Sequence, residues 1–157
     1  MAGDSKIASL KRMKILGFIF DDKPNVSAHI SYSIQKFNRA IWSLSHLKRA
    51  KIDVAILLEV YKIMLRPLLE YSAQVYHHML TNEQSCELER QQIRALKVIY
   101  DFEESTSKLV ERSGLESLST RREKLCSDFA NKLVLSCLLY TSPSPRDLST
   151  SRMPSSA

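Results

Sequence analysis

The longest regular feature of the chain is an apolar stripe in its first half. Between residues 26 and 47 the apolar positions recur every three or four residues, which is the period of an amphipathic helix. The stripe consists of Val26, Ile30, Ile34, Phe37, Ile41, Leu44 and Leu47. We therefore expect a long helix over residues 26–49, with one face in the core.

The segment before this helix has a different pattern. Residues 14–20 form a short apolar run rich in β-forming side chains, and the turn-like run 21–25, which contains Pro24, follows it. An apolar run of this length that is bounded by turn residues is typical of a buried strand. The sequence therefore predicts one short strand and a turn ahead of the long helix.

A second helix is predicted after Asp53, a residue type that caps helix N-termini. Its apolar face would consist of Ile56, Leu57, Val60, Tyr61, Met64 and Leu65. Pro67 lacks a backbone donor and crowds the preceding turn, so we expect a break or kink near Arg66. A further helical piece would continue through Tyr71 to His78.

Three more helices are expected downstream. Thr81 or Asn82 can cap a helix that turns Leu88, Ala95, Leu96 and Ile99 inward. A short helix over residues 105–112 would stop at Gly114, a residue favoured just after helix ends. A last helix would begin near Ser119 and carry Leu125, Phe129, Leu133 and Leu135 on its apolar face. The predicted fold is mainly α: a bundle of about four to five helices preceded by one short β-strand.

Composition agrees with a helical chain and excludes several classes. The 157 residues include only 3 Gly and 5 Pro. There is no apolar run of about 18 residues, so we expect no membrane-spanning helix. Residues 1–10 lack the apolar stretch of a secretory signal peptide. We therefore expect an intracellular location, nuclear or cytoplasmic. The 3 cysteines form no CxxC pair, which excludes a disulfide scaffold and the common zinc modules.

The end of the chain differs from the rest. Residues 142–157 are rich in Ser and Pro and have little to bury, so they are expected to be disordered. The order of residues in 137–157 resembles the conceptual translation of a transposase-type sequencing adapter, with residues 148–150 derived from the sample index. We therefore interpret 137–157 as a disordered tail and adapter artefact.

Positive charge is concentrated in the first third of the chain. Residues 1–52 hold 10 Lys and Arg against 3 Asp and Glu, a net +7, while the whole chain has a formal net charge of +6. A local basic surface suggests a polyanionic partner, although a solvated helix face is the simpler explanation of charge alone. The candidate phosphate contacts are Lys36, Arg39, Lys48, Arg49 and Lys51.

Other candidate chemistry is weaker. Asp21 and Asp22 follow an apolar run and could hold two divalent metals, but no third carboxylate lies on a preceding strand. A turn in which Asp side chains bind backbone donors is the preferred interpretation. Adjacent helical residues diverge in direction, so His77 and His78 make a poor metal site with Cys86.

Two further groups are expected to have structural roles. Cys86 and Cys126 are predicted to lie in or near the core. The basic run 121–124 is most simply a solvated first helical turn, although positive charge is unfavourable at a helix start.

Four segments in order carry a resemblance to a known family. They are Lys14–Asp21 with its Leu-Gly pair, Tyr61–Tyr71 with its Tyr-Lys, Arg-Pro and Glu-Tyr pairs, Leu88–Ile99, and Gly114–Cys126 with its Arg-Arg pair. Together they span residues 13–136 and resemble the end of the palm and the thumb of LINE-type (non-LTR) retrotransposon reverse transcriptases.

This resemblance implies a division of the chain and a function. Residues 1–23 would be the palm-edge strand and turn, and residues 24–136 a helical thumb-like domain. The chain would position the RNA template and DNA primer rather than catalyse. It would hold no cofactor itself, whereas the parent polymerase would use Mg²⁺ on aspartates upstream. Its protein partners would be the palm and fingers of that polymerase, and no membrane contact is expected.

Two alternatives remain. The chain could be a helical protein-interaction module from a degenerate element that does not bind nucleic acid. An independent metal enzyme using Asp21 and Asp22 is the least favoured interpretation.

Overall fold

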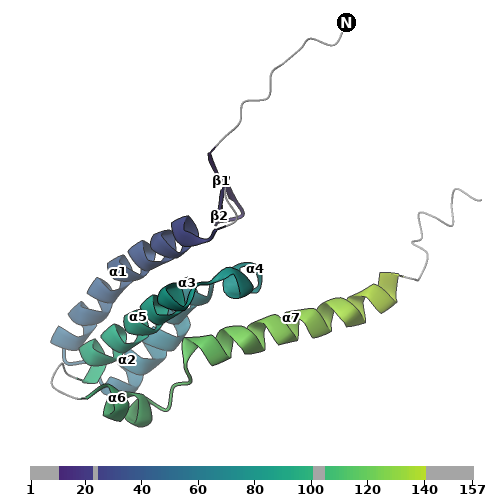
Figure 1. Cartoon of the computed structure of the whole chain (residues 1–157). Coiled ribbons are helices and arrows are strands. Elements are labelled where there is room, and N and C mark those ends of the chain that lie inside the picture. Colours follow the sequence, from purple (N-terminus) through teal and green to yellow (C-terminus); the bar gives the residue numbers. More distant parts are fainter. Residues whose placement is uncertain (1–10, 23–24, 101–104, 141–157) are drawn as a thin grey trace, which may run out of the picture.

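The computed structural model describes residues 11–22, 25–100 and 105–140. A short β-hairpin precedes a set of packed helices, and the last helix projects away from them (Figure 1). The elements are β1 (Arg12–Ile15), β2 (Phe18–Asp21), α1 (Ser27–Arg49), α2 (Val54–Val60), η1 (Tyr61–Leu65), α3 (Arg66–Glu70), α4 (Ala73–Tyr76), η2 (His77–Met79), α5 (Asn82–Tyr100), α6 (Thr106–Ser113) and α7 (Leu118–Tyr140). The predicted fold class, mainly helical with a short β element first, is confirmed.

The β element is a hairpin and not the single buried strand predicted over residues 14–20. β1 and β2 are antiparallel, with Ile15 opposite Phe18. The reversal is made by Leu16 and Gly17, whose φ angles of 48° and 87° are those of a two-residue hairpin turn. Within the two strands Phe18 alone is buried, and all of β1 is exposed. The prediction was wrong because the turn signal, Gly17, lies inside an otherwise continuous apolar run.

Replacing Gly17 with alanine is expected to destabilise the protein by about 2 kcal/mol. A Cβ on Gly17 would lie 3.1 Å from the Tyr71 hydroxyl oxygen, and its φ is unfavourable for any L-residue. Gly114 has a φ of +60°, but a Cβ added there would meet nothing within 4 Å, so Gly114→Ala should cost about 1 kcal/mol from backbone strain alone. Urea unfolding of both variants tests this; equal losses would mean that the Tyr71 contact does not constrain the turn.

α1 has the predicted position and buried face. It runs over Ser27–Arg49, and five of the seven stripe residues are buried while Ile34 and Leu47 are partly buried. α5 packs beside α1, and Arg94 of α5 donates a hydrogen bond from Nη1 to Asn38 Oδ1 of α1 at 2.7 Å. These two long helices form the centre of the bundle (Figure 1).

The helix after Asp53 departs from prediction at Pro67. Asp53 does cap it, accepting a hydrogen bond from the Ala55 backbone amide at 3.0 Å. Helical turns then continue from α2 through α3, because η1 is a π-helical turn in which the Arg66 amide donates to the Tyr61 carbonyl. This wider turn accommodates the proline ring and its missing donor. The helix therefore does not break near Arg66, and the irregularity expected there takes the form of a π-helical turn that ends at Leu65.

The break lies a few residues later. Tyr71 leaves the helical conformation with a ψ of 125°, and Ser72 has a φ of 61°. The buried positions of α2–α3 follow a spacing of four: Leu57, Tyr61, Leu65 and Leu69. Ile56 and Met64, which were predicted to face inward, are 55% and 65% exposed.

The boundaries of α5 and α6 match the predicted signals. The Thr81 hydroxyl accepts from the Gln84 amide while Gln84 Oε1 accepts from the Thr81 amide, which is a reciprocal capping box. α6 ends at Gly114 in the left-handed conformation. The four predicted inward residues of α5 (Leu88, Ala95, Leu96 and Ile99) are all fully buried.

α7 begins at Leu118 and reaches Tyr140, past the residue 136 at which the thumb-like domain was expected to end. Its C-terminal half extends away from the bundle (Figure 1), so Phe129, Leu133 and Leu135 are 48–63% exposed instead of buried. Residues 141–157 lie outside the described residues, so the predicted disorder there stays a prediction. No helix in the described ranges is long and apolar enough to cross a membrane.

Candidate nucleic-acid interface

The five predicted phosphate contacts lie along α1 and the turn after it, but they do not form one patch. Arg39, Arg49 and Lys51 are exposed to solvent. Lys36 is also exposed, and its ammonium lies 4.7 Å from the ring centroid of Tyr32, on the hairpin side of α1. Lys48 is partly buried and its Nζ donates to the Ile99 carbonyl at 2.7 Å.

Lys48 therefore has a structural contact. Ile99 lies in the last turn of α5, where backbone carbonyls lack helical partners and the helix dipole favours a cation. The contact ties the C-terminal ends of α1 and α5 together. It places the cations that follow Lys48 beside the same end of α5.

The turn after α1 directs Lys51 into solvent. Lys51 has a φ of 58°, and its amide donates to the Lys48 carbonyl while the Ile52 amide donates to the Leu47 carbonyl. A left-handed residue after a helix reverses the chain in this way. Because Lys51 is held in the turn by backbone hydrogen bonds, its side chain is presented at the end of the bundle beside Arg49.

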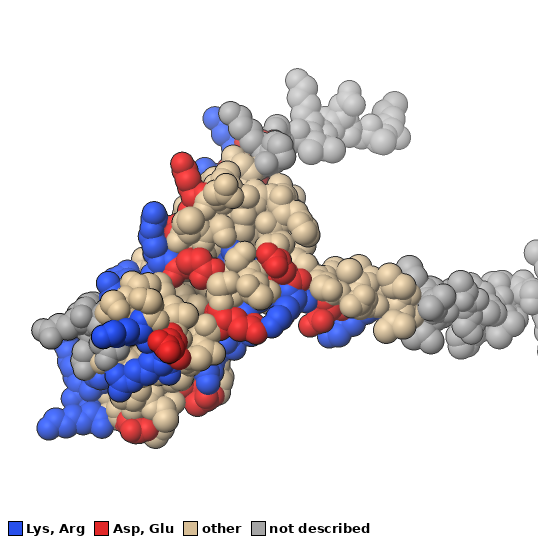
Figure 2. Space-filling model, turned by 60° about the horizontal axis from the view of Figure 1, so that its bottom comes forward, with Lys and Arg blue, Asp and Glu red and all other residues tan. Residues whose placement is uncertain are grey.

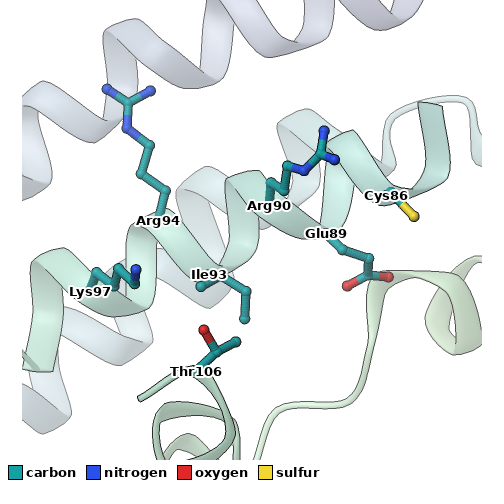
Figure 3. A pocket seen from close by; sticks show the side chains of 7 residues that line it. All are labelled: Cys86, Glu89, Arg90, Ile93, Arg94, Lys97 and Thr106. Atoms are coloured by element: carbon teal, nitrogen blue, oxygen red, sulfur yellow. The ribbon is translucent and has the colours of Figure 1, made fainter. Parts of the chain in front are cut away.

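Cations on α5 were not predicted from the sequence. Arg90, Arg94 and Lys97, at i, i+4 and i+7, line a groove of about 570 Å³ together with Cys86, Glu89, Ile93 and Thr106 (Figure 3). Arg94 reaches toward α1, whereas Ile93 points toward Thr106 at the start of α6. The helical spacing of these cations is present in the sequence. Residues 53–102 have a net charge of −2, however, so the charge of this segment gave no indication of a basic surface.

The cations of α1 and α5 contribute to an uneven surface. Figure 2 shows Lys and Arg gathered toward the end of the bundle opposite the projecting α7. We use the name basic end for the exposed or partly exposed cations of α1, the turn after it and the middle and end of α5, namely Arg39, Arg49, Lys51, Arg94 and Lys97. Arg90 is adjacent but paired with Glu87, from Nη1 to Oε2 at 2.9 Å. Phosphate binding requires cations along a surface and no fixed spacing, which this arrangement provides.

Asp21 and Asp22 are held as turn residues. Asp21 Oδ1 accepts from the Asp22 amide at 3.1 Å, and Asp21 Oδ2 accepts from Arg12 Nε at 3.3 Å. A hydrogen bond with the Asp22 side chain, followed by the Arg12 charge, holds the pKa of Asp21 below its usual value. Asp21, the last residue of β2, therefore binds a backbone donor as the turn interpretation requires, while residues 23 and 24 of the predicted turn lie outside the described residues.

The remaining candidates are scattered. Cys86 is exposed rather than near the core, and Cys126 is partly buried with its Sγ 3.7 Å from the Ala73 carbonyl. His77 and His78 are in edge-to-face contact, at 4.9 Å between ring centroids. Within the described ranges, no group of three or more His, Cys, Asp and Glu side chains is arranged to hold a metal ion.

The segments that carry the family resemblance are joined to one another by hydrogen bonds. The Tyr71 hydroxyl donates to the Leu16 carbonyl at 2.5 Å, which joins the first segment to the second. The Tyr61 hydroxyl donates to Gln92 Oε1 at 2.8 Å, which joins the second to the third. Burial raises the pKa of Tyr61, so this hydroxyl remains a donor.

The fourth segment forms hydrogen bonds with the second and third segments. Arg121 Nε donates to Glu70 Oε1 at 2.5 Å and Arg121 Nη2 to Glu70 Oε2 at 3.2 Å, a two-point contact with the second segment. Gln92 Nε2 donates to the Glu116 carbonyl at 3.0 Å. We call these contacts, together with those of Tyr61 and Tyr71, the motif network. It joins residues that lie up to 55 positions apart in sequence.

Arg121 and Arg122 were predicted to be solvated, and this is wrong. Arg122 is completely buried, and it donates from Nη2 to Ser85 Oγ at 2.8 Å. Its Nε and Nη1 have no hydrogen-bond partner among the described residues. Arg121 is directed onto the buried carboxylate of Glu70. The unfavourable placement of positive charge at a helix start was the one sequence signal of these contacts.

Comparisons of the chain with protein-family models, with curated proteins and with solved structures find no match.

Proposed function

We propose that this chain is the palm-edge and thumb part of a LINE-type retrotransposon reverse transcriptase, and that it holds the template–primer duplex by its phosphates. The observation that carries the binding function is the basic end. Its five cations come from α1, the turn after it and α5, whose C-terminal ends Lys48 ties together, and all five are exposed or partly exposed. Contacts of this kind position a duplex without reading its sequence.

The motif network supports the family assignment. Four short segments, each unspecific alone, supply both partners of a set of hydrogen bonds that join distant parts of the bundle. Under this proposal the fold requires Glu70, Tyr71, Arg121 and the Leu-Gly turn together, which accounts for their joint presence in the sequence. Under this proposal the catalytic carboxylates and their Mg²⁺ belong to the upstream part of the polymerase, which works in the nucleus or cytoplasm.

The double variant Arg49→Glu/Lys51→Glu is expected to weaken binding of an RNA–DNA duplex by at least about tenfold at about 100 mM salt. It should also reduce the slope of log Kd against log salt by about 2, because two phosphate contacts are lost. Fluorescence anisotropy over a salt series measures both quantities.

The matched control is Lys62→Glu/Lys132→Glu, which reverses two charges away from the basic end. The Kd of this control for the duplex should stay within about twofold of that of the unmutated chain, because long-range repulsion is screened at this salt concentration. If both double variants lose the same affinity, the effect is one of net charge and the basic end is not the interface.

An apolar groove supports the second candidate, a protein-interaction module. Ala40, Trp42, Leu47, Met64 and Leu68 are among the residues that line a groove of about 600 Å³ between α1 and the α2–α3 segment. Trp42 is 65% exposed and its ring lies 3.8 Å from that of His46. Exposed aromatic and methionine side chains are typical of protein interfaces. Duplex binding that is absent, or insensitive to salt, would favour this candidate.

A further inference from the structure

Two ammonium groups converge on one tyrosine at the end of the bundle nearest the hairpin. Lys14 Nζ of β1 lies 4.6 Å from the Tyr32 ring centroid and donates to the Tyr32 hydroxyl at 2.8 Å. Lys36 Nζ lies 4.7 Å from the same centroid. Both lysines lower the pKa of Tyr32, Lys14 by its hydrogen bond first. We call Lys14, Tyr32 and Lys36 the lysine–tyrosine clamp.

The clamp has an excess of positive charge. In the part of the chain that the structure describes, no carboxylate forms an ion pair with Lys14 or Lys36. Two like charges beside one ring repel each other, and the ring face offsets only part of this cost. The two lysines, both exposed to solvent, therefore form a local concentration of positive charge that favours an anion.

A cavity adjoins the clamp. It has a volume of about 270 Å³ and is lined by Gly17, His29, Tyr32, Ser33, Lys36, Leu68 and Tyr71. His29 is 1% exposed and stacks on Phe18 with ring centroids 4.2 Å apart. Its Nε2 lies 3.4 Å from the Tyr71 carbonyl oxygen, while its buried Nδ1 has no partner among the described residues. Because Nε2 faces a carbonyl oxygen, it carries the proton of the neutral ring, so Nδ1 is an acceptor in the cavity wall that a hydroxyl group of a ligand would satisfy.

We propose that the clamp and its cavity bind the phosphoryl group of a phosphomonoester. Two ammonium groups balance a dianion, and the Tyr32 hydroxyl, which accepts from Lys14, keeps its proton to donate to a phosphoryl oxygen. The cavity is smaller than the roughly 300–1,000 Å³ of pockets that hold drug-sized ligands, so it admits the phosphoryl group and little more. Lys36 lies one helical turn from Arg39 of the basic end, whereas Lys14 belongs to the hairpin, so a Lys14 variant is the one that distinguishes phosphoryl binding here from duplex binding.

Isothermal titration calorimetry of the full chain tests the charge requirement. Inorganic phosphate and phenyl phosphate are the dianionic probes at pH 8, and dimethyl phosphate is the monoanionic diester. Both dianions should bind, and the diester should bind at least about tenfold more weakly, because one of the two ammonium groups is left unpaired. Equal binding of monoester and diester would overturn the assignment to a dianion.

Variants of the clamp test its location. Lys14→Met and Lys36→Met should each weaken phosphate binding by at least about tenfold, and Tyr32→Phe by a smaller factor, since a charged contact is worth more than a neutral one. Lys132→Met, an exposed lysine on α7, is the matched control and should bind phosphate unchanged. Loss of binding in Lys132→Met, or unchanged binding in both clamp lysine variants with native circular dichroism, would refute the site.

The same variants separate this site from the duplex interface. Lys14→Met should leave RNA–DNA duplex binding within about twofold of that of the unmutated chain, because Lys14 lies on β1 and is not one of the cations of the basic end. If Lys14→Met weakens duplex binding as much as Arg49→Glu/Lys51→Glu does, the clamp is part of the duplex surface and a separate phosphomonoester site is wrong. If duplex binding fails altogether while phosphate binds, the proposed function fails and this inference stands.

Discussion

Glu70→Gln is expected to lower the free energy of unfolding by about 3 kcal/mol. The Glu70 side chain is 8% exposed and receives two hydrogen bonds from Arg121, and Arg66 Nε lies 3.9 Å from Glu70 Oε2. The substitution keeps the shape of the side chain but removes its charge. Two partly buried guanidinium groups then lack a counter-charge, and breaking one side of a buried pair in this way costs more than the pair contributes.

Chemical unfolding in urea measures this loss. The matched control is Glu59→Gln, which removes an exposed carboxylate paired with Lys62 at 2.8 Å; its cost should be below about 0.5 kcal/mol. A double-mutant cycle with Arg121→Gln should give a coupling of at least about 1 kcal/mol, because the two side chains are in direct contact. A cost for Glu70→Gln no larger than that of Glu59→Gln would mean that the motif network does not stabilise the bundle.

Local signals in the sequence were sufficient for most helices. The apolar stripe of residues 26–47 predicted the start of α1 to within one residue. Asp53 and Thr81 cap the starts of α2 and α5, and Gly114 follows the end of α6, as predicted. Each of these signals acts within one or two helical turns, through side-chain capping or backbone conformation. Such features depend little on the rest of the fold, which is why they were predictable.

The errors occurred where two local rules conflict. Gly17 favours a turn, but the apolar residues on both sides favour one strand, and only the docking of Tyr71 on the turn decides between them. Pro67 predicts a break, yet a π-turn preserves the helix because Leu65 and Leu69 remain buried. In both cases tertiary packing, which the sequence pattern does not contain, selects the outcome.

The candidate site was also predictable from the sequence only in part. The sequence identified cations on α1, but it could not separate the exposed Arg49 and Lys51 from Lys48, which is bound to the end of α5. The neighbouring cations on α5 were concealed by acidic residues close to them in sequence. The distribution of a net charge over surfaces depends on which helices lie side by side, so the basic end required the structure.

Arg122→Met is expected to raise the free energy of unfolding by about 1–4 kcal/mol. Arg122 is completely buried, and its guanidinium donates to Ser85, while Nε and Nη1 have no partner among the described residues. A buried charge with so few partners loses its hydration without full compensation. Methionine retains an unbranched apolar stem of similar length, so the packing of α7 against α4 and α5 is largely preserved.

The measurement is urea unfolding of Arg122→Met beside Arg90→Met, an exposed arginine whose replacement should change stability by less than about 0.5 kcal/mol. Ser85→Ala supplies a second test. It removes the acceptor of Arg122 Nη2, so it should cost about 1–3 kcal/mol in the parent protein and close to nothing in Arg122→Met. If Arg122→Met is destabilised instead, the contacts of the buried guanidinium compensate fully for its lost hydration. A stabilised variant would show that Arg122 is retained at a cost to folding, which is typical of residues kept for binding or assembly rather than for stability.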